Sequence, residues 1–287
     1  MTEMSPTVAQ WDLVLRIKLR SKELGISGPQ IVKALSVSTT YWSQVMNYHG
    51  VLTEAKLHLL LDLLEFAPDE QDELLGLRAH AKERGWWSRY SAILSDDALR
   101  LYGLESGASS IRVYESVVIP GLLQSEEYAH ALIASDLVAD VRKVDVKKFV
   151  EVRMLRQQRL GHADLHFVAV IGQAALLQQN GGPAVLKRQL AHLASVIENN
   201  QTTVDIRVIP FTATSGSALG GATFYLLDFA SSQLPTVAWH ESAAFGELSD
   251  NEKRVEGLGV MYAKAQDIAL SQADTLALIK KTAGEIS

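Results

Sequence analysis

The segment at residues 25–50 most constrains how this chain folds, because its helix-capping and turn residues predict two short helices joined by a tight turn. Ser27 is a favourable N-cap for the first helix, and Pro29 suits a first helical turn, where no backbone donor is needed. Val37 and Ser38 form the turn. Ser38 then caps a second helix, expected over residues 39–47.

The second helix predicts a surface of uncharged polar side chains. Trp42, Val45 and Met46 recur at three- and four-residue steps and are expected to face inward. The side chains left pointing outward are those of Thr39, Thr40, Tyr41, Ser43, Gln44 and Asn47. Such a surface is typical of a helix that reads base edges in the DNA major groove. An ordinary helical hairpin without a DNA-binding role is the alternative.

This segment resembles the helix-turn-helix of the Cro and λ-repressor (XRE) family, whose pattern runs roughly G-L-S-Q-E-E-L-A-x-x-L-G-V-S-x-x-x-I-S. The residues in register with that pattern are Gly25, Ile26, Ser27, Ile31, Leu35, Val37, Ser38 and Ser43. Four positions depart from it: Gly28 replaces a Gln that commonly contacts DNA, Val32 a small Ala, Ser36 the turn Gly, and Met46 a frequent Glu.

The resemblance implies that the protein binds double-stranded DNA, and it indicates which residues make the contacts. The side chains expected to contact bases are those of Thr39, Thr40, Tyr41 and Gln44. The residues expected to hold phosphates are Ser27, Ser38, Ser43 and Asn47, and Gly28 occupies a further DNA-contact position. Proteins of this kind usually bind as dimers to half-sites ~34 Å apart.

The length of 287 residues leaves room for one small and one large domain. Further amphipathic helices are expected over residues 8–24, 53–64 and 68–82. We therefore predict an all-α λ-repressor-like domain over residues 1–82, a boundary segment over 83–95, and a mixed α/β regulatory and dimerisation domain over 96–287. The fold class is α+β overall.

The formal charge is unevenly distributed along the chain. The net charge is −6, yet the first 60 residues carry six basic against four acidic side chains, or +2, which leaves −8 for the remainder. A basic head on an acidic body suits a DNA-reading domain attached to a domain that does not bind DNA. Because +2 attracts DNA weakly, we expect a homodimer.

The composition also limits the chemistry and the compartment. With no cysteine, the chain has no disulfide, thiol catalysis or cysteine-ligated zinc. No stretch approaches the ~18 uncharged apolar residues that a membrane span needs. The first residues lack the basic start and apolar core of a secretory signal. We expect a cytoplasmic protein without membrane association.

Beyond residue 94 the pattern predicts alternating strands and helices. Strands are expected over residues 110–116, 165–171, 203–210, 222–229 and 236–241. Helices are expected over residues 97–108, 144–160, 173–179, 184–199, 255–270 and 271–283, together with one that opens at Ser125. Ser231 and Ser232 are candidates for a hairpin turn.

Four segments of this region resemble an actinobacterial group of XRE regulators with a large C-terminal domain. They are R-G-W-W at 84–87, L-E-x-x-A-x-x-I-R-x-Y-E at 104–115, I-P-G-L-L-Q-S-E-E-Y-A at 119–129, and I-R-V-I-P-F with the following glycine-rich loop and T-F strand at 206–224. The resemblance implies an antitoxin-like transcriptional regulator, often encoded beside a small partner protein.

The sequence contains no recognisable set of catalytic residues, so we expect a protein that is not an enzyme and has no cofactor. The chain contains no G-x-S-x-G elbow, H-E-x-x-H motif or P-loop. The glycine-rich segment 215–221 is too irregular for a dinucleotide fingerprint. Only His162 and His166 stand at metal-ligand spacing, across a loop-to-strand junction, so no metal site is expected.

The polar residues of the C-terminal region leave three interpretations open. Glu105 and Arg112 are expected to form an architectural ion pair across a helix-to-strand turn. Arg112, Gln124 and Arg153 are candidates for lining a ligand pocket near the Pro-Gly turn at residues 120–121. Hydrolytic carboxylates are the third interpretation. We therefore predict a DNA-binding regulator whose C-terminal domain senses a small molecule or a partner protein. The alternatives are an antitoxin-like protein that mainly binds its partner, and an enzyme.

Overall fold

The computed structural model describes residues 4–135, 143–200, 202–214, 223–241 and 246–286. The chain divides into two compact units, Met1–Arg89 and Tyr90–Ser287. The division falls inside the predicted boundary segment 83–95. The glycine-rich segment 215–221 of the sequence analysis lies outside the described residues. No helix in the described part of the chain is long and apolar enough to cross a bilayer.

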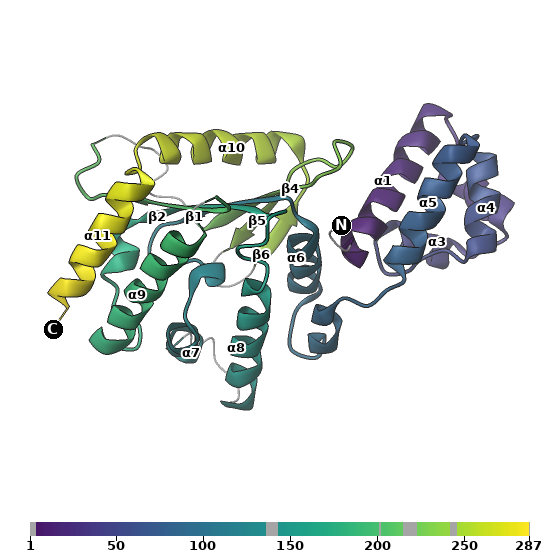
Figure 1. The fold of residues 1–287 in the computed structure, drawn as a ribbon. Helices are drawn as coiled ribbons and strands as arrows, with labels where there is room; N and C mark the ends of the chain where they lie inside the picture. Colours follow the sequence, from purple (N-terminus) through teal and green to yellow (C-terminus); the bar gives the residue numbers. More distant parts are fainter. Residues whose placement is uncertain (1–3, 136–142, 201, 215–222, 242–245, 287) are drawn as a thin grey trace. The chain divides into compact units, whose positions relative to one another are not determined.

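The described part of the first unit contains five α-helices. They are α1 (Pro6–Glu23), α2 (Gly28–Leu35), α3 (Thr39–Met46), α4 (Glu54–Leu63) and α5 (Pro68–Ala81), and a 3₁₀ turn, Trp86–Tyr90, follows them (Figure 1). The hydroxyls of Ser38 and Thr53 accept backbone N–H bonds at the starts of α3 and α4. Ser36 ends α2 at φ 50°, the left-handed conformation that usually selects glycine.

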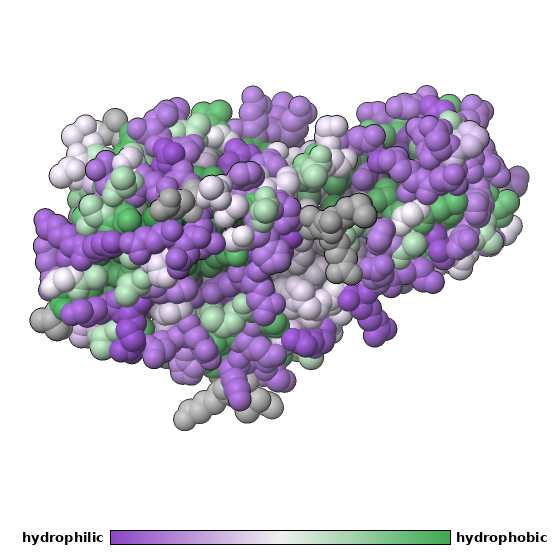
Figure 2. Space-filling model, in the orientation of Figure 1, coloured by the Kyte–Doolittle hydropathy of each residue, from purple (hydrophilic) through white to green (hydrophobic). Residues whose placement is uncertain are grey.

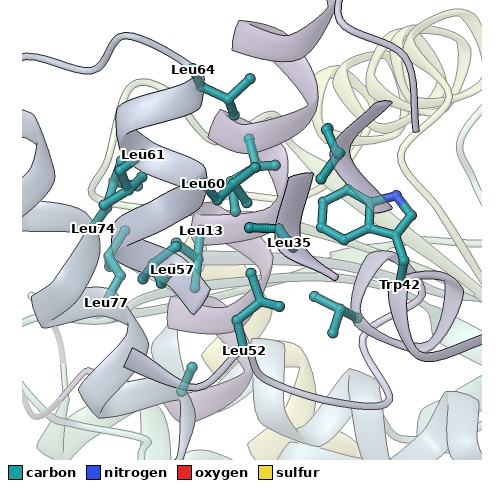
Figure 3. Close-up of a cluster of buried hydrophobic side chains, with 14 of the residues drawn as sticks. Leu13, Leu35, Trp42, Leu52, Leu57, Leu60, Leu61, Leu64, Leu74 and Leu77 are labelled. Carbon is teal, nitrogen blue, oxygen red and sulfur yellow. The ribbon is translucent and has the colours of Figure 1, made fainter. Parts of the chain in front are cut away.

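A single hydrophobic core holds these helices together. Leucine side chains from α1, α2, α4 and α5 converge with Trp42 of α3 (Figure 3). The fully or largely buried members include Leu13, Leu35, Leu52, Leu57, Leu60, Leu61, Leu64, Leu74 and Leu77. Because Trp42 and Val45 of α3 belong to this core, the opposite side of α3 faces solvent.

The second unit combines a mixed sheet with helices. Its helices are α6 (Asp96–Gly107), α7 (Glu126–Ser135), α8 (Lys143–Gln157), α9 (Pro183–Asn199), α10 (Glu252–Asp267) and α11 (Gln272–Glu285). Its strands are β1 (Ser110–Glu115), β2 (His166–Gly172), β3 (Val204–Ile209), β4 (Phe224–Asp228), β5 (Val237–Glu241) and β6 (Gly246–Ser249). Short 3₁₀ turns span Gly121–Leu123 and Gln173–Leu176. The α+β class is confirmed.

The described strands form one sheet in the order β3-β2-β1-β4-β5-β6. The strands β1, β2 and β3 run parallel, whereas β4, β5 and β6 continue the sheet in antiparallel pairs. The helix α10 lies along one face, and α9 lies on the other side with α7 and α8 (Figure 1).

Alternation along β1 decides which side chains meet which face of the sheet. Tyr114 packs in the cluster that contains Tyr262 of α10, and the guanidinium of Arg112 lies 5.9 Å from the Tyr262 ring. Since neighbouring residues of a strand point to opposite faces, Val113 and Glu115 face away from α10.

The elements that differ from the sequence predictions include the following three. The predicted helix over 173–179 is only the 3₁₀ turn Gln173–Leu176, because the chain must turn again at Gly181 and Gly182, both at positive φ. The strand β6 was not expected, since four residues with no apolar alternation give no strand signal. The helix α10 begins at Glu252, three residues before the predicted start at Val255, because Asn251 caps it.

One face of the molecule shows how apolar and polar residues are distributed on it. The face drawn in Figure 2 is mainly hydrophilic, with apolar atoms in separate patches. Among the described residues, the large apolar side chains that remain exposed include Leu19, Leu59, Leu177 and Phe211. Scattered exposure of this kind is normal for a folded protein.

Neighbouring leucines of α4 test the core. Leu60 is fully buried, whereas Leu59 is 52% exposed. We expect Leu60→Ala to lower the free energy of unfolding by ~2–5 kcal/mol, because it opens a cavity. The control Leu59→Ala should change it by less than ~0.5 kcal/mol. Urea-induced unfolding of the full chain, followed by circular dichroism, measures both, and equal losses would contradict this packing.

Candidate nucleic-acid interface and polar cavity

The outer surface of α3 carries most of the predicted DNA-contact residues. The side chains of Thr39, Thr40, Ser43, Gln44 and Asn47 are exposed. Thr40 and Gln44 lie four residues apart and therefore on one side of the helix. In the described part of the chain, no side chain bonds to Thr39, Thr40 or Gln44. Their hydrogen-bonding groups are therefore available to a ligand.

The other polar residues of the interface make local hydrogen bonds. The Asn47 amide donates to the Ser43 hydroxyl at 3.2 Å. The Ser38 hydroxyl accepts from the Tyr41 backbone N–H at 3.1 Å and keeps its own O–H as a donor. The Ser27 hydroxyl and backbone N–H both donate to the side-chain oxygen of Gln30, at 2.6 and 2.8 Å. Ser27 is exposed but already engaged.

Gly28 and Tyr41 differ from the rest of the predicted set. Gly28 opens α2, and a Cβ added there would lie 3.5 Å from the indole nitrogen of Trp42, an ordinary contact. Tyr41 is half-buried against the core, and its hydroxyl donates to the Val51 carbonyl at 3.4 Å. Its predicted outward position is wrong, because the Tyr41 ring packs where α3 meets the residues after it.

A polar cavity of ≈ 520 Å³ lies in the second unit, where β1 ends and β4 begins. Its lining comes from the ends of β1, β4 and β5, from α6, α7 and α8, and from the turn at Gly121. The chain leaves β1 toward β2 on one side, while β4 pairs with β1 on the other. The crevice beyond the carboxyl ends of parallel strands such as β1 is a common ligand site in α/β sheets.

Two arginines of α8 form one wall of the cavity. Arg156 is buried and donates two hydrogen bonds to the Glu105 carboxylate, at 2.9 and 2.8 Å. Burial tends to lower the pKa of Arg156, but the charge and hydrogen bonds of Glu105, together with Tyr102 and Tyr225, more than offset it and hold that pKa well above its usual value. Arg153 is half-buried and donates to the side-chain oxygen of Gln124 at 2.7 Å.

Glu115 and Glu241 face the same cavity from the strand ends. Burial raises the pKa of Glu115 to about 7, and the Thr223 hydroxyl, which donates at 2.7 Å, offsets this only in part. The charge of Glu241 raises the Glu115 pKa further. Burial likewise raises the pKa of Tyr225, which also lines the cavity. The cavity therefore holds a carboxyl group poised near neutral pH.

The predicted pocket residues are only partly brought together. Gln124 and Arg153 line the cavity near Gly121, and their predicted role in binding a ligand stays a prediction. Arg112 lies on the α10 face of the sheet, where it donates to both Asp228 carboxylate oxygens at 3.2 and 3.0 Å. The predicted Glu105–Arg112 ion pair is wrong for the same reason, since strand alternation turns Arg112 away from α6.

Several cavity residues escaped the sequence prediction. Those added by the structure include Arg156, Thr223, Tyr225, Trp239 and Glu241. No local pattern of the sequence points to these residues; the alternation of β1 could only have placed Glu115 on the face of the sheet opposite to Arg112. In the part of the chain described, no three histidine, aspartate or glutamate side chains gather as a metal site.

The raised Glu115 pKa predicts a pH-dependent stability. The folded protein holds this proton more tightly than the unfolded chain, so its contribution to stability is lost as pH rises from about 4.5 to about 7. We expect Glu115→Gln to remove this loss, making the variant up to about 3 kcal/mol more stable than the parent at pH 8 but little different at pH 5. Urea unfolding at both pH values measures this. The exposed control Glu247→Gln should follow the parent, and a Glu115→Gln profile parallel to the parent would contradict the assignment.

Comparison with protein families gives one match. The model of a domain of unknown function (DUF5753) matches residues 98–281, more than half of the chain and most of the second unit. Comparisons with curated proteins and with solved structures found no match. On the strength of the family match, the chain belongs to the DUF5753 family.

Proposed function

We propose that this chain is a sequence-specific DNA-binding transcriptional regulator of the XRE type, acting as a homodimer. The observation that carries the proposal is the outer surface of α3. It presents the free polar groups of Thr39, Thr40 and Gln44 on a short helix that follows a tight turn. In this proposal α2 and α3 form a helix-turn-helix, with α3 as the recognition helix.

The chemistry of these side chains suits base edges. A glutamine amide can donate and accept at once, which matches adenine N6 and N7 in the major groove. A threonine offers a hydroxyl to either kind of base edge and a methyl group to thymine. The Ser38 hydroxyl and the first backbone N–H groups of α3 are suitable donors to phosphates.

Weak electrostatics favours two copies on one DNA site. Lys33 is the only charged residue among residues 25–50. The first unit as a whole is not basic: the +2 of residues 1–60 is cancelled by the acidic residues that follow, and residues 1–89 carry ten basic against eleven acidic side chains, or −1. Each phosphate neutralised by a cation adds about −0.9 to the slope of log affinity against log salt. We therefore expect a shallow salt dependence per copy, and a dimer to supply the affinity that one copy lacks.

The second unit is proposed as the regulatory part. The cavity at the end of β1 favours control by a small molecule. A partner protein encoded nearby is the other source of control, and the sequence resemblance alone supports it.

Two substitutions on α3 test the DNA-reading surface. Selection of bound duplexes from a random pool by the full chain should yield an inverted repeat. On that sequence, Thr40→Ala and Gln44→Ala should each weaken binding by ~1–3 kcal/mol, because each removes a base contact. Gel shift measures the affinity. His58→Ala, at an exposed position of α4, is the matched control and should bind as the parent does. A pool without enrichment, or a double variant that binds as tightly as the parent, would refute the proposal.

A further inference from the structure

We infer that the cavity at the end of β1 binds a small zwitterion, a molecule with a carboxylate, an ammonium group and an apolar body. The inference names a ligand class for the regulatory role in the proposed function and rests on that role only for its biological meaning. The binding itself is argued from the two walls of the cavity.

The α8 wall presents guanidinium donors that the protein does not use. Among the described residues, Arg153 has no carboxylate partner, and its bond to Gln124 occupies Nη1 alone. Arg156 gives Nε and Nη2 to Glu105 and keeps Nη1. Arg153 Nε and Arg156 Nη1 lie 3.6 and 3.7 Å from the position that a Cβ would take at Gly121. Because Gly121 has no side chain, space remains beside both donors, and a ligand carboxylate is the group that matches them.

The sheet wall presents two carboxylates that lack a cation. Glu115 accepts hydrogen bonds from the Thr223 hydroxyl and from backbone N–H groups of Ser116 and Val118, but no described cation pairs with it. Both carboxylates line the cavity, and the charge of Glu241 disfavours ionisation of Glu115, so the two groups repel each other. A ligand ammonium group between them would relieve this repulsion.

The two walls together exclude simpler ligands. A doubly negative ligand such as a phosphate monoester would meet Arg153 favourably but would face Glu115 and Glu241. A simple cation would meet the carboxylates but would face Arg153. A zwitterion satisfies both walls at once.

Aromatic side chains supply the surface for the ligand body. Tyr102, Tyr225 and Trp239 line the cavity together with aliphatic residues such as Leu101 and Ile119. A volume of ≈ 520 Å³ lies within the range of small-molecule sites and suits an amino acid or a short peptide. Trp239 also provides a fluorescence signal for binding.

The test starts from a panel of the twenty common amino acids and a set of dipeptides. The full chain is screened by thermal shift at millimolar concentrations, and the affinity of the best binder is then measured by calorimetry and by tryptophan fluorescence. We expect at least one zwitterion to raise the unfolding temperature. Its N-acetylated and its C-amidated derivatives should each bind at least about tenfold more weakly, because each lacks one of the two charges.

Variants connect the binding to the two walls. Arg153→Gln and Glu115→Gln should each weaken the binding at least about tenfold, and Arg153→Lys should keep part of it, because it keeps the charge but not the planar donors. The exposed pair Arg254 and Glu247 lies outside the cavity and provides charge-matched controls. Arg254→Gln and Glu247→Gln should bind as the parent does. Circular dichroism checks that each variant is folded.

Three results would overturn the inference: no zwitterion that stabilises the chain, derivatives that bind as tightly as the parent compound, or a folded Arg153→Gln variant with unchanged affinity. The outcome is separable from that of the proposed function. A chain that binds its DNA but no zwitterion refutes only this inference, and a chain that binds a zwitterion but no DNA refutes only the regulator proposal.

Discussion

The buried ion pair between Arg156 and Glu105 is the interaction on which the second unit most depends. Both side chains are nearly inaccessible, at 6% and 4% exposure, and their two hydrogen bonds tie α8 to α6. The Tyr102 ring lies 4.4 Å from the same guanidinium. Two charges removed from water are stable only with such geometry, and removing one partner leaves an uncompensated charge that costs ~3–5 kcal/mol. The pair therefore fixes the rotation of α8, and this rotation presents Arg153, one turn earlier, to the cavity.

The first unit was the more predictable part of the chain. The described helices α1, α3, α4 and α5 begin and end within two residues of the expected bounds. Local residues mark several of their starts: Ser38 and Thr53 cap α3 and α4, and Pro68 begins α5. Tyr41 shows where local patterns fail. The spacing along the helix places Tyr41 on the polar side, but its side chain packs against the core and its hydroxyl donates to the carbonyl of Val51, ten residues later. Helical periodicity predicts which face of a helix is apolar. It does not predict which residues of the other faces are covered by the chain that follows.

The site in the second unit was harder to predict for a physical reason. Glu105 was expected to pair with Arg112, seven residues away, but it pairs with Arg156, 51 residues away. Strand alternation placed Arg112 on the other face of the sheet, and no local pattern reveals a partner so distant in sequence. Gln124 lies close to the recognisable Pro-Gly turn in the sequence, whereas Arg153, Tyr225 and Trp239 reach the cavity only through the packing of α8 and the order of the strands.

In the proposed function, the weak charge of the first unit and the cavity of the second belong together. A head with little net charge binds DNA tightly only when two copies act at once. A ligand that changes how two second units associate would then change DNA affinity without touching α3. Such control requires differential binding of the ligand to the two states. The cavity carries both positive and negative groups, and one of them, Glu115, has a pKa near neutrality. A change in the arrangement of these groups between the two states would change the affinity for a charged ligand.

Hydroxyl-radical footprinting of the full chain on its selected DNA tests the central claim most directly. For a dimer that reads DNA through α3, we expect two protected regions on one face of the duplex, centred about one helical turn, ~34 Å, apart. Both regions should disappear together as the protein is diluted. A single protected region, or uniform protection without sequence preference, would contradict the proposed dimeric reading of DNA.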